Sequence, residues 1–173
     1  MIEDVFKAAI DLLDKQEQAA LSTIISSKGS LPMSEKSKML VTPEGTIIGT
    51  VGGGCLEADV WAEARRVMEE GKSSIQQFIL TEKYAGESGL NCGGIVGILT
   101  EPLPEHGQEL FRTLLTLKDT GHRGTLATIL TVHPAYPEGQ RKFLVCDDGR
   151  TVGSLGDAVL EAFVQRRGQE ILQ

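Results

Sequence analysis

The sequence predicts an α+β fold in a single domain, with a helix–strand–hairpin–helix unit used twice around a mixed sheet. The first observation is the helical spacing of apolar residues in residues 2–16, followed by a β-rich run, ALSTIIS, at residues 20–26. The second is a hairpin pattern in which KMLVT and TIIGT flank turn residues 43–45. The third is that the same order of elements returns after residue 107.

The other elements of the first half follow from periodicity and turn residues. Apolar side chains recur at helical spacing from Leu56 to Met68, and Gly71 follows them, so we expect a second helix there. SIQQFIL (residues 74–80) and IVGILTE (residues 95–101) are rich in β-branched residues and predict strands. A long loop containing NCGG separates these two strands.

The return of the pattern is visible as an internal repeat. VFKAAIDLLDKQEQAALSTII (residues 5–25) aligns with LFRTLLTLKDTGHRGTLATIL (residues 110–130). With a shift of one residue, LVTPEGTIIGTVGGGCLEA (residues 40–58) aligns with LVCDDGRTVGSLGDAVLEA (residues 144–162). Two nearly collinear matches indicate an internal duplication.

The repeat defines the expected organisation of the chain. We expect one domain over residues 1–173, with a first copy at about 1–103 and a shorter second copy at about 104–173. The second copy has no counterparts of the strands at 74–80 and 95–101. Such an unpaired two-stranded unit could join two chains, so a homodimer is a possible assembly.

Composition limits the classes of function. The chain has 173 residues, 40% of them hydrophobic and 24% charged, and a net charge of −7, which disfavours broad contact with nucleic acid or an anionic membrane. The N-terminus is acidic and amphipathic and no apolar run could span a bilayer, so we expect a cytoplasmic protein. The cysteines should then be reduced, and their spacing forms no zinc pattern with the three histidines.

Features that the two copies share are expected to serve the fold. Gly49 aligns with Gly153, and close packing or a turn explains a glycine at both positions. Glu57 aligns with Glu161, and a glutamate in a first helical turn favours the positive end of the helix dipole. For Glu57, this structural explanation and a role in ligand binding are both open.

Features found only in the first copy are candidates for function. The second copy has Asp157, an ordinary N-cap, where the first copy has Gly53 followed by Gly54. These two glycines would leave the first N–H groups of the helix open to an anionic ligand, whereas Gly52 aligns with Gly156 and is shared by both copies. The alternative is a tight turn whose donors bind water.

Two cysteines lie beside glycines. Cys55 aligns with Val159, so it is either an inward-facing small apolar residue or a thiolate favoured by the helix N-terminus. Cys92 precedes Gly93 and Gly94 at a loop-to-strand junction, where it is either packed or a second reactive thiol. Cys146, on an expected strand, is expected to be structural.

Two motifs in this order resemble the XdhC/CoxI family. MLVTPEGTIIGTVGGGCLE (residues 39–57) has that family's hairpin and its G-x-x-GGGC-x-E signature. GLNCGGIVGILTEPL (residues 89–103) is similar to its second motif. The resemblance covers nearly the whole chain.

The resemblance implies an accessory protein for molybdenum hydroxylases such as xanthine dehydrogenase and carbon monoxide dehydrogenase, without turnover of its own. Such a protein binds the molybdenum cofactor while a cysteine desulfurase sulfurates it, and then delivers it to the apo-hydroxylase. Two walls of a cofactor site are implied, and their residues are Gly52, Gly53, Gly54, Cys55 and Glu57 on one side and Cys92, Gly93 and Gly94 on the other.

The chain also departs from the family pattern. We expect the C-terminal Rossmann-like domain of full-length members to be absent. The loop that reads close to GSAPRKPGAKM in the family has Met33 for the arginine and Ser37 for a glycine, which would remove a phosphate contact unless Lys36 or Lys38 replaces it. A sulfur-transfer enzyme using Cys55 or Cys92, and a scaffold without a cofactor site, therefore remain alternatives.

Overall fold

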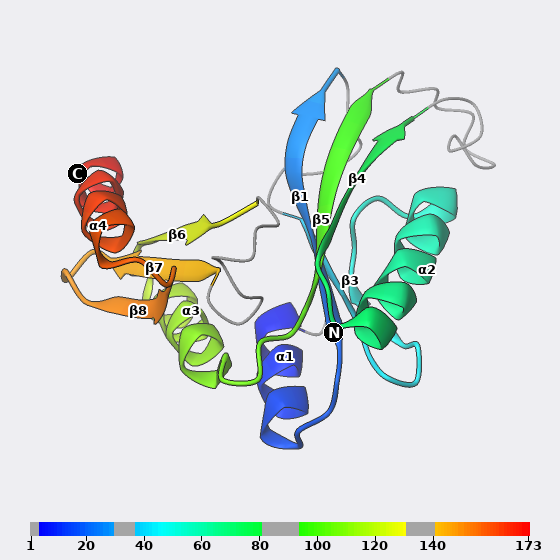
Figure 1. Cartoon of the computed structure of the whole chain (residues 1–173), viewed down its shortest axis with the longest axis horizontal. Helices are drawn as coiled ribbons and strands as arrows, with labels where there is room; N and C mark the ends of the chain where they lie inside the picture. The colour runs from blue at the N-terminus through cyan, green and yellow to red at the C-terminus, as the bar shows by residue number, and fades with distance from the viewer. Residues whose placement is uncertain (1–3, 30–36, 81–93, 131–140) are drawn as a thin grey trace.

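The computed structural model describes residues 4–29, 37–80, 94–130 and 141–173 (Figure 1). In this part of the chain it contains, in order, α1 (Val5–Asp14), β1 (Ala20–Lys28), β2 (Lys38–Val41), β3 (Ile47–Gly49), α2 (Gly54–Glu70), β4 (Ser74–Ile79), β5 (Ile95–Pro102), α3 (Gln108–Thr120), β6 (Gly124–Thr128), β7 (Lys142–Cys146), β8 (Thr151–Ser154) and α4 (Ala158–Leu172). The helices and strands expected from periodicity are thus present, and the predicted α+β class and single domain are confirmed.

The strands form two sheets instead of the single mixed sheet expected. One sheet has the order β3-β2-β1-β5-β4 and the other the order β6-β7-β8. All the strand pairs of the described residues are antiparallel. Strands that follow one another pair as β1–β2, β2–β3, β4–β5, β6–β7 and β7–β8, whereas β1 and β5 pair although they are far apart in the chain. After β5 the chain continues into α3.

The helices and sheets stack in layers that run across Figure 1. In the larger sheet, α2 packs on one face through Val60 and Val67, and α1 covers part of the other through Ala9 and Leu13. The smaller sheet lies between α3 and α4. The layer order is therefore α2, larger sheet, α1, α3, smaller sheet, α4.

The interface between α1 and α3 joins the two halves. The rings of Phe6 and Phe111 are 6.2 Å apart and tilted by 38°. At the edges of the interface, Asp14 forms an ion pair with Arg112 at 2.7 Å, and Asp4 forms another with Lys118. The aromatic contact excludes water, and the ion pairs fix the relative position of the helices.

The two strand–hairpin–helix units have matching local structure. Gly49 and Gly153 have φ of 83° and 93°, and an added Cβ would lie 2.3 Å from a strand carbonyl oxygen in both cases. Gly45 and Gly149 close the two hairpin turns with φ of 88° and 86°. A shared origin by duplication remains a prediction, but these glycines are required by the local geometry.

The two strands without counterparts in the second copy are part of the larger sheet, and the homodimer expected through them stays a prediction. β5 lies between β1 and β4 and pairs with both. The hydroxyls of Ser22 and Thr100, 2.9 Å apart and buried, link β1 and β5 on the α2 side. Of these two strands, β4 lies at one edge of the larger sheet, and β3 lies at the other edge.

Candidate functional site

The turn before α2 has a backbone path that favours glycine. Gly52, Gly53 and Gly54 have φ of 150°, 73° and 60°. A Cβ built on Gly53 or Gly54 meets nothing within 4 Å. These two glycines are therefore needed for their conformation and not for close packing, and they leave open space around the backbone.

Glu57 holds this turn together from the first turn of α2. Its Oε1 accepts hydrogen bonds from the N–H of Val51 at 3.3 Å, from the N–H of Gly53 at 2.9 Å, and from the hydroxyl of Thr50. The Thr50 hydroxyl in turn accepts from the N–H of Gly52 at 3.1 Å. This geometry gives Glu57 a structural role, while a binding role for it stays a prediction.

The second unit repeats this network. The carboxylate of Glu161 accepts from the Ser154 hydroxyl and from the N–H of Leu155, both at 2.7 Å. The Leu155 N–H and the Ser154 hydroxyl together hold the pKa of Glu161 below its usual range. Sequence analysis missed these networks, although a hydroxyl residue seven positions before each glutamate, Thr50 or Ser154, could have indicated them.

The two helix starts differ at the cap. Oδ1 of Asp157 accepts from the N–H groups of Val159 at 2.8 Å and Leu160 at 3.0 Å. At the start of α2, the N-cap Gly53 has no side chain, and no side-chain cap is present. The prediction that the first copy lacks the N-cap is confirmed, so the early N–H groups of α2 have no carboxylate acceptor like Asp157.

Cys55 is exposed at this uncapped start. The alternative that its alignment with Val159 marks an inward position is wrong, because Val159 itself is 82% exposed. Both positions lie on the outer side of their helices, next to Leu56 and Leu160, which face the sheets. The thiol is therefore accessible to a ligand or a partner.

Cys146 has the opposite environment. It lies on β7 with no exposed surface and packs against Leu110 and Leu117 of α3. Burial raises the pKa of its thiol, which keeps it protonated and unreactive. The expectation that Cys146 is structural is confirmed.

The second predicted wall falls mostly outside the described residues. Cys92 and Gly93 lie outside them, as do Met33 and Lys36 of the preceding loop. Gly94 is described, and its carbonyl accepts a hydrogen bond from the N–H of Leu80 at 2.7 Å. The binding roles of these residues stay predictions.

Two side chains from the middle of α2 fix this helix against the β2–β3 hairpin. Trp61 donates from Nε1 to the carbonyl of Gly45 at 2.8 Å, and Arg65 donates to the carbonyl of Pro43 at 2.6 Å.

Among the described residues, no three His, Cys, Asp or Glu side chains come together to hold a metal ion. None of the described helices could cross a membrane.

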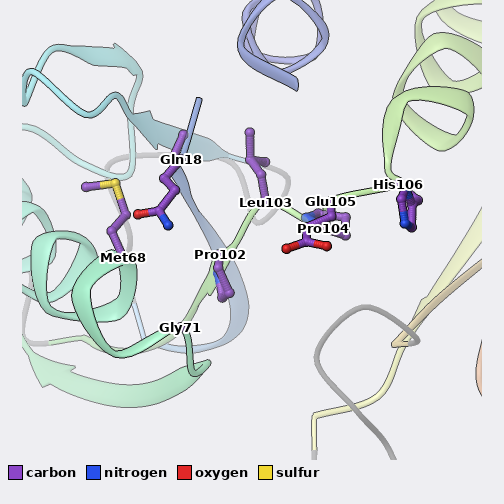
Figure 2. Close-up of a pocket in the computed structure, with 9 residues that line it drawn as sticks. Gln18, Met68, Gly71, Pro102, Leu103, Pro104, Glu105 and His106 are labelled. Carbon is purple, nitrogen blue, oxygen red and sulfur yellow. The ribbon is translucent and has the colours of Figure 1, made fainter. Parts of the chain in front are cut away.

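A separate cavity of about 350 Å³ lies near the other end of α2 (Figure 2). Met68 and Gly71 come from the end of α2, and Gln18 from the segment before β1. The connector from Pro102 to His106 forms the rest of the wall. The glycines of the α2 start do not line this cavity, so it is distinct from the candidate site.

Comparison with known proteins shows the family. The model of the XdhC and CoxI family matches residues 12–79 and 117–173. The chain therefore belongs to the XdhC and CoxI family, as the two motifs indicated. The match includes parts of both copies of the predicted repeat and leaves out residues 80–116, which contain the second motif.

Individual relatives have longer chains. Over 119 residues, the chain is 30% identical to Uncharacterized protein YqeB of Escherichia coli and 29% identical to a probable xanthine dehydrogenase subunit from Bacillus subtilis. These matches cover 69% and 68% of this chain but only 21% and 35% of the relatives. A crystal structure of a xanthine dehydrogenase from Bacillus halodurans matches with a TM-score of 0.62 and 23% identity, over 84% of this chain and 44% of that one, which shows a shared fold.

Proposed function

We propose that the start of α2 binds the molybdenum cofactor and that the chain is an accessory protein for a molybdenum hydroxylase related to xanthine dehydrogenase. The observation that carries this proposal is the difference between the helix starts. In α4, the carboxylate of Asp157 accepts hydrogen bonds from N–H groups of the first turn. In α2, the corresponding N–H groups have no such acceptor and lie beside Gly53, Gly54 and the exposed Cys55. The names of two relatives support the xanthine dehydrogenase connection.

The residues at the α2 start fit such a cofactor chemically. When bound, the cofactor supplies an anionic phosphate and a molybdenum centre that takes soft ligands. Backbone N–H groups at a helix start suit the anion, and the Cys55 thiol suits the soft metal or its sulfur. The open space at Gly53 and Gly54 leaves room for both.

The partners follow from this role. A carrier of this kind receives sulfur for its cofactor from a cysteine desulfurase and passes the cofactor to an apo-hydroxylase. Glu57 would act as a positioning residue, because its carboxylate fixes the N–H of Gly53 and the path of the turn. Cys55 would contact the cofactor itself.

The test is the pterin content of the protein after anaerobic reconstitution, measured as the fluorescent oxidation product. We expect wild type to retain pterin and Cys55→Ala to lose most of it. Val159→Ala is the matched control, because Val159 is also exposed and lies at the equivalent place in α4. Failure of wild type to retain pterin would overturn the proposal and favour a scaffold role.

The exposure of Cys55 also supports a second candidate, a sulfur-transfer protein. Here the Cys55 thiolate would attack the outer sulfur of a desulfurase persulfide and become a persulfide, while the desulfurase regains its thiolate. Incubation with a desulfurase and cysteine should then leave cyanide-releasable sulfur on Cys55. Its absence from wild type would exclude this candidate without affecting the pterin measurement.

A further inference from the structure

β4 is the longest edge strand in the described part of the chain. It pairs with β5 over all six of its residues, Ser74–Ile79, without a register shift. The other edge strands there are shorter, since β3, β6 and β8 have three, five and four residues. Edge strands are normally protected from pairing by charged residues, proline or bulges, and SIQQFI has none of these.

Internal contacts fix which side chains of β4 point outward. Ser74 and Gln76 form hydrogen bonds with the buried Glu63 of α2, and Phe78 packs in the core beneath α2. Ile75, Gln77 and Ile79 therefore lie on the opposite face of the sheet. Ile75 is 43% exposed and Ile79 is 59% exposed.

The exposed face continues onto the next strand. Ile95 of β5 is paired with Ile79 and is 36% exposed, so Ile79 and Ile95 form an apolar patch beside this edge, and Ile75 lies further along the same face. Exposed apolar surface next to unpaired backbone groups favours addition of another strand. β4 stands at one end of the sheet order, and none of the described strands pairs with its outer edge (Figure 1).

We propose that β4 pairs antiparallel with β4 of a second copy of this chain, so that two five-stranded sheets join into one across a two-fold axis. The sequence of β4 is self-complementary in one register, with Gln77 opposite Gln77 of the second copy. In that register Ile75 lies opposite Ile79 of the second copy, on both sides of the axis. The isoleucine patches of the two copies then become continuous.

Charge also favours a second copy as the partner. Each chain carries a net charge of −7, so most pairs of surfaces on two copies repel each other. β4 has no ionisable side chain, and the carboxylate of Glu63 beneath it forms an ion pair with Arg66 at 2.6 Å. The residues of β4 itself therefore place no like charges opposite one another in the proposed pairing.

A site-directed cross-link tests the register. With Cys55 and Cys92 replaced by serine, Gln77→Cys would place two thiols opposite each other, and facing residues of antiparallel strands have Cβ atoms about 4.5–5.5 Å apart. Mild oxidation of the native protein should produce a disulfide-linked dimer within the folded state. Ile47→Cys, on the edge strand β3 and 39% exposed, is the matched control and should remain largely monomeric on a denaturing gel. Equal cross-linking of both variants would overturn the proposed register.

Charge reversal tests the interface itself. Analytical ultracentrifugation should show a dimer for wild type, and Ile75→Lys with Ile79→Lys should weaken the dimer at least about tenfold, because lysines would face lysines. Mixing this variant with Ile75→Glu and Ile79→Glu should restore a heterodimer, which shows that both variants are folded. A monomeric wild type, or a Lys variant that remains as dimeric as wild type, would contradict the proposal. Neither result depends on cofactor binding.

Discussion

The starts of α2 and α4 are built in the same way up to one point and then differ. Glu57 and Glu161 both accept hydrogen bonds from the turn that precedes their helix. The two starts differ at the N-cap, four residues before each glutamate. Asp157 accepts hydrogen bonds from the free N–H groups of α4, whereas Gly53 has no side chain that could accept them in α2.

This difference separates what the fold needs from what is available for function. A turn held by a carboxylate occurs in both units and can be explained by stability alone. The loss of a cap lowers helix stability, and nothing in the described residues of the first unit compensates for it at the same N–H groups. In our proposal, an anionic ligand bound at the α2 start accepts hydrogen bonds from these N–H groups and so replaces the missing cap.

The largest expected contrast concerns the two thiols. Cys55 is exposed at a helix start, while Cys146 is fully buried on a strand. Iodoacetamide should label native Cys55 faster than Cys146 by on the order of 10³-fold or more, because Cys146 reacts only after the protein opens. Site-resolved mass spectrometry of labelled peptides measures both rates in one sample. Comparable rates would contradict the burial of β7.

Glycines of the shared turns should be far less tolerant than those of the open turn. Gly49→Ala and Gly153→Ala should each lower the free energy of unfolding by about 2–4 kcal/mol, because φ is positive and the Cβ would clash with a strand carbonyl. Gly54→Ala should cost only about 1–2 kcal/mol, since its positive φ is the only penalty and its Cβ meets open space. Urea denaturation measures all three. A Gly54→Ala variant as unstable as Gly49→Ala would show that the first turn is tightly packed.

The cap itself should contribute a smaller amount. Asp157→Ala should lower the free energy of unfolding by about 1 kcal/mol, because the N–H groups of Val159 and Leu160 lose their acceptor. Asp157→Asn retains an acceptor oxygen and should recover most of this loss. Thermal unfolding of the three proteins tests this order, and an Asp157→Ala variant as stable as wild type would refute the capping role.

The smallest effect is a dependence on pH. The pKa of Glu161 is lowered from 4.5 in the folded protein, so its contribution to stability is complete above that value and is lost as the pH falls through the folded pKa. Since the group is partly exposed, the contribution should be under about 1 kcal/mol. Glu161→Gln should therefore flatten the decrease in unfolding free energy below pH 4.5. An unchanged pH profile would mean that other carboxylates account for it.

Local features of this fold could be predicted from the sequence. The end of α2 at Gly71, where φ is 64°, and the cap of α4 at Asp157 both follow from residue type and position. Aligning the copies also identified the missing cap of α2 without any structure. These features depend on contacts within a few residues.

Features that depend on distant contacts could not be predicted. The insertion of β5 between β1 and β4, and the separation of the strands into two sheets, depend on pairings between residues far apart in the chain. The exposure of Cys55 could not be predicted from the alignment either. The aligned residue is a valine, which is usually buried, but Val159 is exposed. The ion pair between Glu101 and Lys142 at 2.7 Å, which links the two sheets, has no sequence pattern.

The most direct test of the central claim exchanges the two helix starts. Gly53→Asp with Gly54→Ala gives α2 the residues that cap α4 and disfavours the positive φ of both glycines, so that the turn can take the extended path of Asp157, whose φ is −143°. Asp157→Gly with Ala158→Gly gives α4 the residues of the α2 start. Pterin retention after anaerobic reconstitution should fall at least about tenfold in the first variant, because the carboxylate occupies the N–H groups and repels the anion, and should be unchanged in the second. If the first variant, with its fold confirmed by circular dichroism, retains as much pterin as wild type, the α2 start does not hold the cofactor.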